Sequence, residues 1–105
     1  MNINKLFSSA RKWVKFRLGV DADGNGTLPD ASDAVRWCLL GAVHKCYPGY
    51  GRDTQAAIIR LRDVISGLYP EFVDRYSDAG TIVNFNNDAK TDFRKIKRVI
   101  KAANV

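Results

Sequence analysis

The strongest constraint on the fold lies in residues 91–103, where a helical pattern separates apolar from basic side chains. Thr91 is a residue type that caps helices, and Asp92 suits the positive end of a helix dipole. Residues three and four apart place one apolar stripe along the predicted helix: Phe93, Ile96, Val99, Ile100 and Ala103. The opposite side carries Arg94, Lys97, Arg98 and Lys101. We predict a closing helix with one face in the core and one in solvent.

The composition allows a single core that this helix can join. The chain has 105 residues, of which 46% are hydrophobic, so we predict one domain spanning residues 1–105. No apolar run approaches the roughly 18 residues that cross a bilayer. The start "MNINKLFSSARKW" also lacks the apolar segment of a secretory signal. We expect no membrane contact and a location in the cytoplasm of the cell that makes the protein.

The spacing of apolar residues changes from a helical to a strand period within the first 30 residues. A short first helix is indicated by an apolar stripe at Ile3, Leu6, Phe7 and Ala10. Over residues 13–20 apolar and other side chains alternate, which predicts a half-buried strand. The turn "DADGNG" then predicts a hairpin, because Gly24 and Gly26 can adopt positive φ. We expect a short returning arm around residues 27–28, since Pro29 cannot donate a ladder hydrogen bond.

Residues 33–47 are apolar on nearly every side and predict a central buried helix, which Asp30 or Ser32 can cap. Gly41 lies inside this segment, where glycine costs roughly 1 kcal/mol relative to alanine. We infer that another part of the chain packs against the backbone at Gly41.

The rest of the chain is mainly helical by pattern. A third helix is expected to begin at Asp53 or Thr54 and to end near Gly67, before Pro70. Weaker patterns predict a helical turn in "EFVDRYS" and a short strand in "TIVNF". The predicted fold is a single small α+β domain, with an N-terminal helix and a β-hairpin followed by three or four packed helices.

Residues 21–32 match an EF-hand calcium loop up to its eighth position. Asp21, Asp23 and Asn25 stand where oxygen ligands belong, with a glycine at the sixth position. Ser32 replaces the bidentate glutamate, and a strand pattern precedes the loop where an EF-hand needs a helix. We interpret the segment as a polar hairpin turn, keep calcium binding as an alternative, and predict no metal or other cofactor.

Cys38, His44 and Asn86 or Asn87 supply the residue types of a thiol hydrolase. Cys38 and His44 are six residues apart, about 240° around a helix, so they would point to different sides. Cys46 would lie about 12 Å from Cys38 along the axis, too far for a disulfide. We interpret Cys38 as a small buried residue, predict no catalytic site, and keep a thiol-dependent enzyme as an alternative.

The segment "NFNNDAKTD" could present Asn86, Asn87 and Asp88 to a ligand. Asn and Asp also commonly bond their own backbone in turns, which would help to start the last helix. We favour the second interpretation.

Charge is distributed unevenly along the chain. The net charge is +6, both ends are basic, and residues 21–88 are net acidic. The basic residues Arg94, Lys97, Arg98 and Lys101 are therefore our candidate partner-binding set. A protein with an acidic surface is the expected partner, and sequence-independent nucleic-acid binding is the alternative. Stacking by Tyr47, Tyr50 and Arg52 would favour nucleic acid if they lay beside this set.

Several short motifs follow one another in order along the chain. They fall on Trp13, Asp21, Asp23, Gly24, Arg36, Trp37, Cys38, Gly41, Ala42, Phe85, Asn87, Asp88, Thr91 and Ala102. In this pattern the chain resembles a family of small uncharacterised proteins of bacteria and their phages. The chain departs from that family at Asn25 and Gly26, where members usually have arginine or another residue. It also has Arg94 and Lys95 where members often have acidic residues.

The resemblance implies no activity, and it leaves the roles of five motif residues open: Trp37, Cys38, Gly41, Asn87 and Asp88. It implies a bacterial or phage accessory protein. Together with the missing catalytic set, this predicts a non-enzymatic binding module that contacts a host or phage macromolecule.

Overall fold

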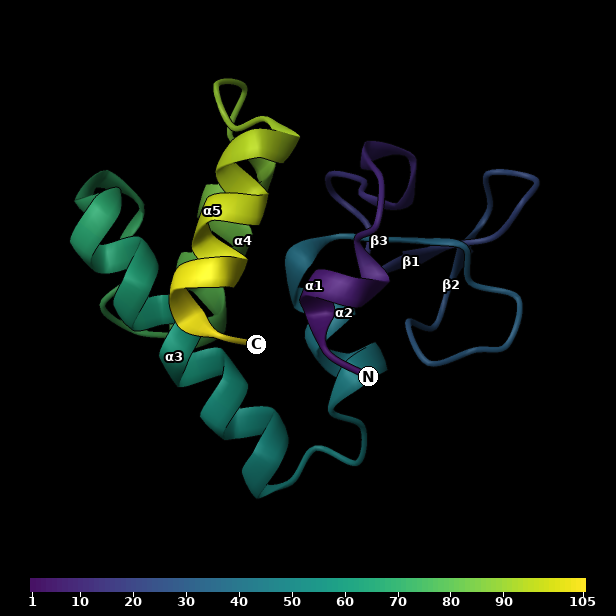
Figure 1. The fold of residues 1–105 in the computed structure, drawn as a ribbon, viewed down its shortest axis with the longest axis horizontal. Helices are drawn as coiled ribbons and strands as arrows, with labels where there is room; N and C mark the ends of the chain where they lie inside the picture. The colour runs from purple at the N-terminus through teal and green to yellow at the C-terminus, as the bar shows by residue number, and fades with distance from the viewer.

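Helices form most of the structure, and a small three-stranded sheet lies on one side of it (Figure 1). The computed structural model describes residues 1–105. Its elements are, in order, α1 (Ile3–Leu6), η1 (Ala10–Lys12), β1 (Gly19–Val20), β2 (Gly26–Thr27), β3 (Arg36–Trp37), α2 (Leu39–Cys46), α3 (Arg52–Leu68), η2 (Pro70–Phe72), α4 (Asp78–Asn87) and α5 (Phe93–Ala103). In Figure 1, α3, α4 and α5 group on the left, and α1, α2 and the sheet on the right. The predicted α+β class is confirmed.

One hydrophobic cluster of 19 buried residues includes side chains from α1 through to the last residues of the chain. From the predicted N-terminal stripe, Ile3, Leu6 and Phe7 are buried, whereas Ala10 is exposed in η1. On α4, Phe85 is fully buried and stacks on Tyr69, with ring centroids 5.2 Å apart. The core therefore ties the two ends of the chain to the central helices.

The predicted hairpin is confirmed, although its strands are short. β1 pairs antiparallel with β2, so that Gly19 lies opposite Thr27 and Val20 opposite Gly26. Gly24 in the turn has a φ of 86°, the left-handed conformation that glycine adopts at little cost. β1 is the central strand, because β3 pairs antiparallel with its other edge.

The strand predicted over residues 13–20 is wrong except for its last two residues. Phe16 has a φ of 71°, and this left-handed conformation interrupts the extended backbone. Upstream of it, Trp13 makes one isolated bridge to Trp37. The apolar residues of the alternating pattern do not share one buried face, because Val20 is buried whereas Phe16 and Leu18 are exposed.

The helix predicted over residues 33–47 begins later, at Leu39. The preceding residues extend the sheet instead, where the Val35 N–H donates to the Val20 carbonyl at 2.8 Å and β3 follows directly. Residues 35–37 therefore form hydrogen bonds with β1 instead of the local helical bonds that the apolar pattern predicted.

Cys38 caps α2, rather than the predicted Asp30 or Ser32, and its Sγ accepts from the Gly41 N–H at 3.3 Å. The inference that another part of the chain packs against Gly41 is confirmed. A Cβ at this position would overlap the carbonyl of Leu18. Glycine is therefore what allows the segment leading into β1 to cross α2 closely.

The helices expected in the C-terminal half are confirmed as α3 and α5. Asp92, rather than Thr91, caps α5, with its carboxylate accepting from the Lys95 N–H at 2.9 Å. In "EFVDRYS", only the first residues are helical, as part of η2. None of the helices combines the length and the apolar character that crossing a membrane requires.

The strand predicted in "TIVNF" is wrong, because these residues lie in α4. The Ser77 side chain caps this helix by accepting from the Gly80 N–H at 3.0 Å. Thr81, Ile82 and Phe85 are buried, so residues three and four apart face the core. Packing of this face against neighbouring helices outweighs the β propensity of the segment.

We expect Gly41→Ala to lower the free energy of unfolding by about 3 kcal/mol, because the new methyl group collides with main-chain atoms. Gly67→Ala is the matched control, since a Cβ there meets no atom within 4 Å in α3. Its higher helix propensity should raise the free energy of unfolding by up to about 1 kcal/mol. Urea denaturation of the two variants measures both effects, and equal stabilities would refute the close crossing at Gly41.

Candidate functional site

The buried side chain of Asn86 joins three separate parts of the chain. It is 1% exposed. Its Oδ1 accepts from the Trp13 indole N–H at 2.7 Å and from the Leu39 backbone N–H at 3.0 Å. Its Nδ2 donates to the Val14 carbonyl at 3.3 Å and to Asn87 Oδ1 at 2.9 Å. All four hydrogen-bonding positions of this amide are therefore occupied.

The end of α4 next to Asn86 is covered by the same N-terminal segment. Asn87 Oδ1 accepts from the Phe16 N–H at 2.8 Å. The Lys15 ammonium donates to the Asp88 carbonyl at 2.6 Å, at the negative end of the helix dipole. The Asp88 carboxylate accepts from the Lys90 N–H at 2.9 Å. The interpretation of local turn bonding is thus confirmed for Asp88 and wrong for Asn86 and Asn87, which bond residues far away in sequence.

Three of the motif residues with open roles, Trp37, Cys38 and Gly41, lie close to this junction. Trp37 is buried and its indole N–H donates to the Pro29 carbonyl at 2.8 Å. Its own carbonyl accepts from the Val14 N–H at 3.0 Å. Gly41 lies under Leu18, and Cys38 caps the helix that contains Gly41. These motif residues therefore hold the N-terminal segment across α2 and α4.

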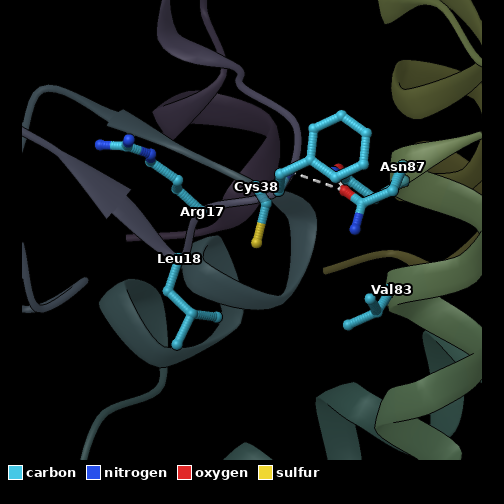
Figure 2. Close-up of a pocket in the computed structure, with 7 residues that line it drawn as sticks. Arg17, Leu18, Cys38, Val83 and Asn87 are labelled. Atoms are coloured by element: carbon cyan, nitrogen blue, oxygen red, sulfur yellow. Dashed lines mark hydrogen bonds between the residues drawn. The ribbon is translucent and has the colours of Figure 1, made fainter. Parts of the chain in front are cut away.

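A pocket of about 140 Å³ opens beside this junction. Figure 2 shows the Cys38 sulfur pointing into it, Leu18 and Val83 on opposite sides, and the Asn87 amide at its edge. Phe16, Arg17 and Asn86 complete the lining. Sequence reasoning did not find this pocket, because its walls come from three segments with unrelated patterns.

Cys38 has the burial expected of a structural cysteine, with 6% of its surface exposed. Burial raises the pKa of its thiol, and the hydrogen bond from Gly41 opposes this shift only in part. The only histidine of the chain, His44, does not line the pocket, and its ring packs against Tyr50 at a centroid distance of 4.9 Å. Both Cys38 and Cys46 are free thiols.

The calcium-like loop is organised around Asp21. One carboxylate oxygen of Asp21 accepts from the N–H groups of Asp23 at 3.0 Å and Asn25 at 2.9 Å. The loop connects β1 and β2 rather than two helices. No group of three or more His, Cys, Asp or Glu side chains is placed to hold a metal ion. Asp21 therefore shapes the hairpin turn.

The predicted basic set divides into two parts. Arg94, Arg98 and Lys101 are exposed on α5. Lys97 instead turns toward α1, where its ammonium donates to the carbonyls of Asn4 and Phe7, both at 3.1 Å. Burial lowers the pKa of Lys97, and the nearby charge of Lys101 adds to the effect. Lys97 thus anchors α5 to the first helix.

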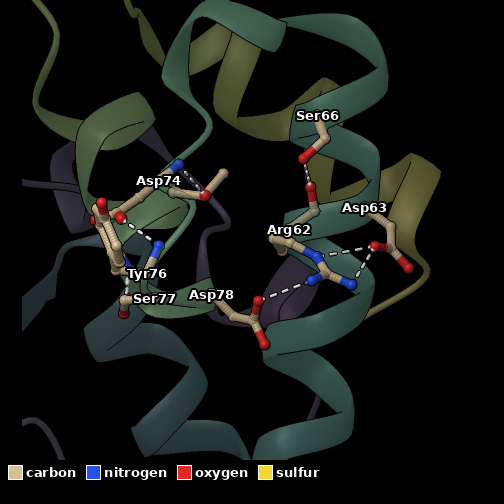
Figure 3. Close-up of polar contacts among 9 residues, drawn as sticks. Arg62, Asp63, Ser66, Asp74, Tyr76, Ser77 and Asp78 are labelled. Atoms are coloured by element: carbon tan, nitrogen blue, oxygen red, sulfur yellow. Dashed lines mark hydrogen bonds and ion pairs between the residues drawn. The ribbon is translucent and has the colours of Figure 1, made fainter.

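Almost none of the chain's positive charge is paired internally. Among 17 lysines and arginines, only Arg62 forms ion pairs, with Asp63 at 2.7 Å and Asp78 at 2.8 Å. Figure 3 shows how this arginine connects α3 to the start of α4. Hydrogen bonding to Asp63 is the largest cause of its raised pKa. The exposed cations of α5 have no carboxylate partner within the protein.

An open hollow of about 510 Å³ adjoins this basic face. It is lined by Tyr69, Asp92, Arg94, Lys95 and Arg98. The Lys95 ammonium lies 5.9 Å from the centre of the Tyr69 ring. Tyr69 is therefore the aromatic residue beside the cations. Tyr47, Tyr50 and Arg52, which the sequence offered for stacking, do not line the hollow.

The comparisons with known proteins identify a family but no activity. A model described as a family of unknown function (DUF6197) matches residues 6–104. The chain belongs to this family, which confirms the resemblance to an uncharacterised family of small proteins. No curated protein and no solved structure matches the chain significantly.

We expect Asn86→Ala to lower the free energy of unfolding by about 3 kcal/mol or more, because it leaves several buried donors and acceptors without partners. Asn84→Ala is the control on the same helix. Asn84 is exposed and makes one hydrogen bond, to the Phe72 carbonyl at 3.2 Å. Its loss should cost about 0.5 kcal/mol. Similar urea midpoints for both variants would contradict the central role of Asn86.

We expect iodoacetamide at pH 7.5 to label Cys38 in the folded protein roughly tenfold more slowly than in urea, because burial disfavours the thiolate. A Cys46→Ser background isolates the signal, which mass spectrometry can follow over time. Labelling that is as fast in the folded as in the unfolded protein would revive the thiol-enzyme alternative.

Proposed function

We propose that the chain is a non-enzymatic binding module that contacts an acidic protein surface through α5. The contact residues are Arg94, Arg98 and Lys101, which we call the α5 cation face. One observation carries the proposal: the charges on this face are exposed and have no internal carboxylate partners. In keeping with the bacterial and phage proteins that the chain resembles, we propose that it is an accessory protein acting in the cytoplasm.

The buried side of α5 fixes where the charges of the α5 cation face lie. Ile96, Val99 and Ile100 are fully buried, so α5 cannot rotate without losing core contacts. Arg94 and Arg98 are one helical turn apart and project from the same side. Cations at fixed positions along a helix favour a partner with matching carboxylates, through faster association and through discrimination against other surfaces.

The environment of Cys38 supports the non-enzymatic part of the proposal. A buried thiol with a raised pKa is a weak nucleophile. The imidazole of His44 packs on Tyr50 instead of lining the pocket with Cys38. The residue types of a thiol hydrolase are thus present without a base beside the thiol.

Nucleic-acid binding remains a second candidate, and Tyr69 is the observation that favours it. Its side chain lines the same hollow as Arg94 and Arg98. Cations that neutralise phosphates beside an aromatic ring that stacks on bases are typical of single-strand binding. Such binding would weaken steeply as salt rises.

We expect the triple variant Arg94→Ala, Arg98→Ala, Lys101→Ala to retain about tenfold less of its partner, because several favourable charge contacts are lost. Lys97 is kept, since it bonds to α1. The measurement uses the immobilised protein, a nuclease-treated lysate of the cell in which it is made, and quantitative mass spectrometry.

The control variant removes the same charge from exposed residues elsewhere: Arg11→Ala, Lys12→Ala and Arg75→Ala. It should retain the partner as the wild type does. If both variants lost the partner equally, net charge rather than the α5 cation face would explain the binding. If neither variant lost the partner, the contact surface would not include the α5 cation face. Binding only to a labelled single-stranded oligonucleotide, and only at low salt, would favour the second candidate.

A further inference from the structure

We propose that the pocket between α2 and α4 binds a small molecule with one apolar ring and a hydrogen-bond acceptor. None of the residues of the α5 cation face lines this pocket, so the inference is independent of the proposed function. Three features support it: the size of the pocket, its free donor and the conformation of Phe16.

The pocket has the size of a single ring. Its volume is about 140 Å³. An engineered apolar cavity of about 150 Å³ in another protein binds benzene. Here Leu18 and Val83 form opposite apolar walls, and the Cys38 sulfur lies between them (Figure 2). A buried, protonated thiol behaves as a small apolar surface toward such a ring.

The edge of the pocket offers one donor with a fixed orientation. Asn87 Oδ1 accepts from the Phe16 N–H and from Asn86 Nδ2. Because both of these groups are donors, the oxygen of the amide must face them. The Asn87 Nδ2 group then turns toward the pocket, as Figure 2 shows, and donates to no atom of the protein. A carbonyl or similar acceptor on the ligand would complete this amide.

Phe16 shapes the rim in an unfavourable conformation. Its φ is 71°, which is rare for a bulky residue, and its side chain is 76% exposed. The hydrogen bond from its N–H to Asn87 holds this conformation. Strain of this kind concentrates at binding sites, where the surrounding structure maintains it. An exposed aromatic ring here extends the apolar wall out toward an incoming ligand.

Benzamide and toluene are suitable probes, because they share a ring and only benzamide carries an acceptor. We expect benzamide to shift the backbone amide resonances of residues lining the pocket, with a saturable Kd of about 1 mM. Val83→Trp fills the pocket and should weaken binding of both probes by roughly tenfold or more. Val73→Trp is the matched control on an exposed valine outside the pocket and should leave both Kd values unchanged.

Asn87→Asp tests the donor without filling the pocket. The carboxylate can still accept from Phe16 and Asn86, but it offers no N–H to the ligand. It should weaken benzamide binding about fivefold and leave toluene binding unchanged. Absence of saturable benzamide binding to the wild type would overturn the inference, as would equal effects of Val83→Trp and Val73→Trp. A pocket variant that loses benzamide should still bind the macromolecular partner, so the two proposals can fail separately.

Discussion

The four hydrogen bonds of the Asn86 amide are the interaction on which the rest of the structure depends. This amide lies on the last turn of α4 and satisfies a free N–H at the start of α2 as well as the indole of Trp13. The amide is buried, so these hydrogen bonds lie away from solvent. A buried amide with every partner in place specifies one arrangement, since any shift leaves polar groups unpaired at a cost of about 1–3 kcal/mol each.

The exposed features follow from that arrangement. With Trp13 and Val14 held by Asn86, the next residues must cross α2, and they do so where Gly41 leaves room for Leu18. This crossing leaves the pocket beside Cys38 and places Phe16 at its rim. Elsewhere in the fold, Lys97 donates to the carbonyls of Asn4 and Phe7 and so orients α5 against the first helix. The solvent-exposed side of α5 therefore carries cations that form no ion pair within the protein.

Several features were predictable from local patterns. The closing helix was clear because its apolar and basic residues separate cleanly at the helical period, and the hairpin because "DADGNG" contains the required turn residues. Packing at Gly41 was predictable because glycine is costly inside a helix. Predictions failed where distant contacts compete with propensity: residues 13–18 are irregular, β3 replaces the start of a helix, and "TIVNF" is helical.

The sequence by itself determined the α+β class, the hairpin, the helices α3 and α5, and the family, because each rests on residues near one another in the chain or on motifs in order. Only the tertiary structure decided what Asn86 and Asn87 do. Apart from the bond between the two side chains, all their partners are more than 45 residues away in sequence. It also decided that the Lys97 ammonium bonds to the first helix, whereas Arg94 and Arg98 are exposed. The physical reason is that a side chain's role depends on which groups satisfy or desolvate it, and those groups come together only when the chain is packed.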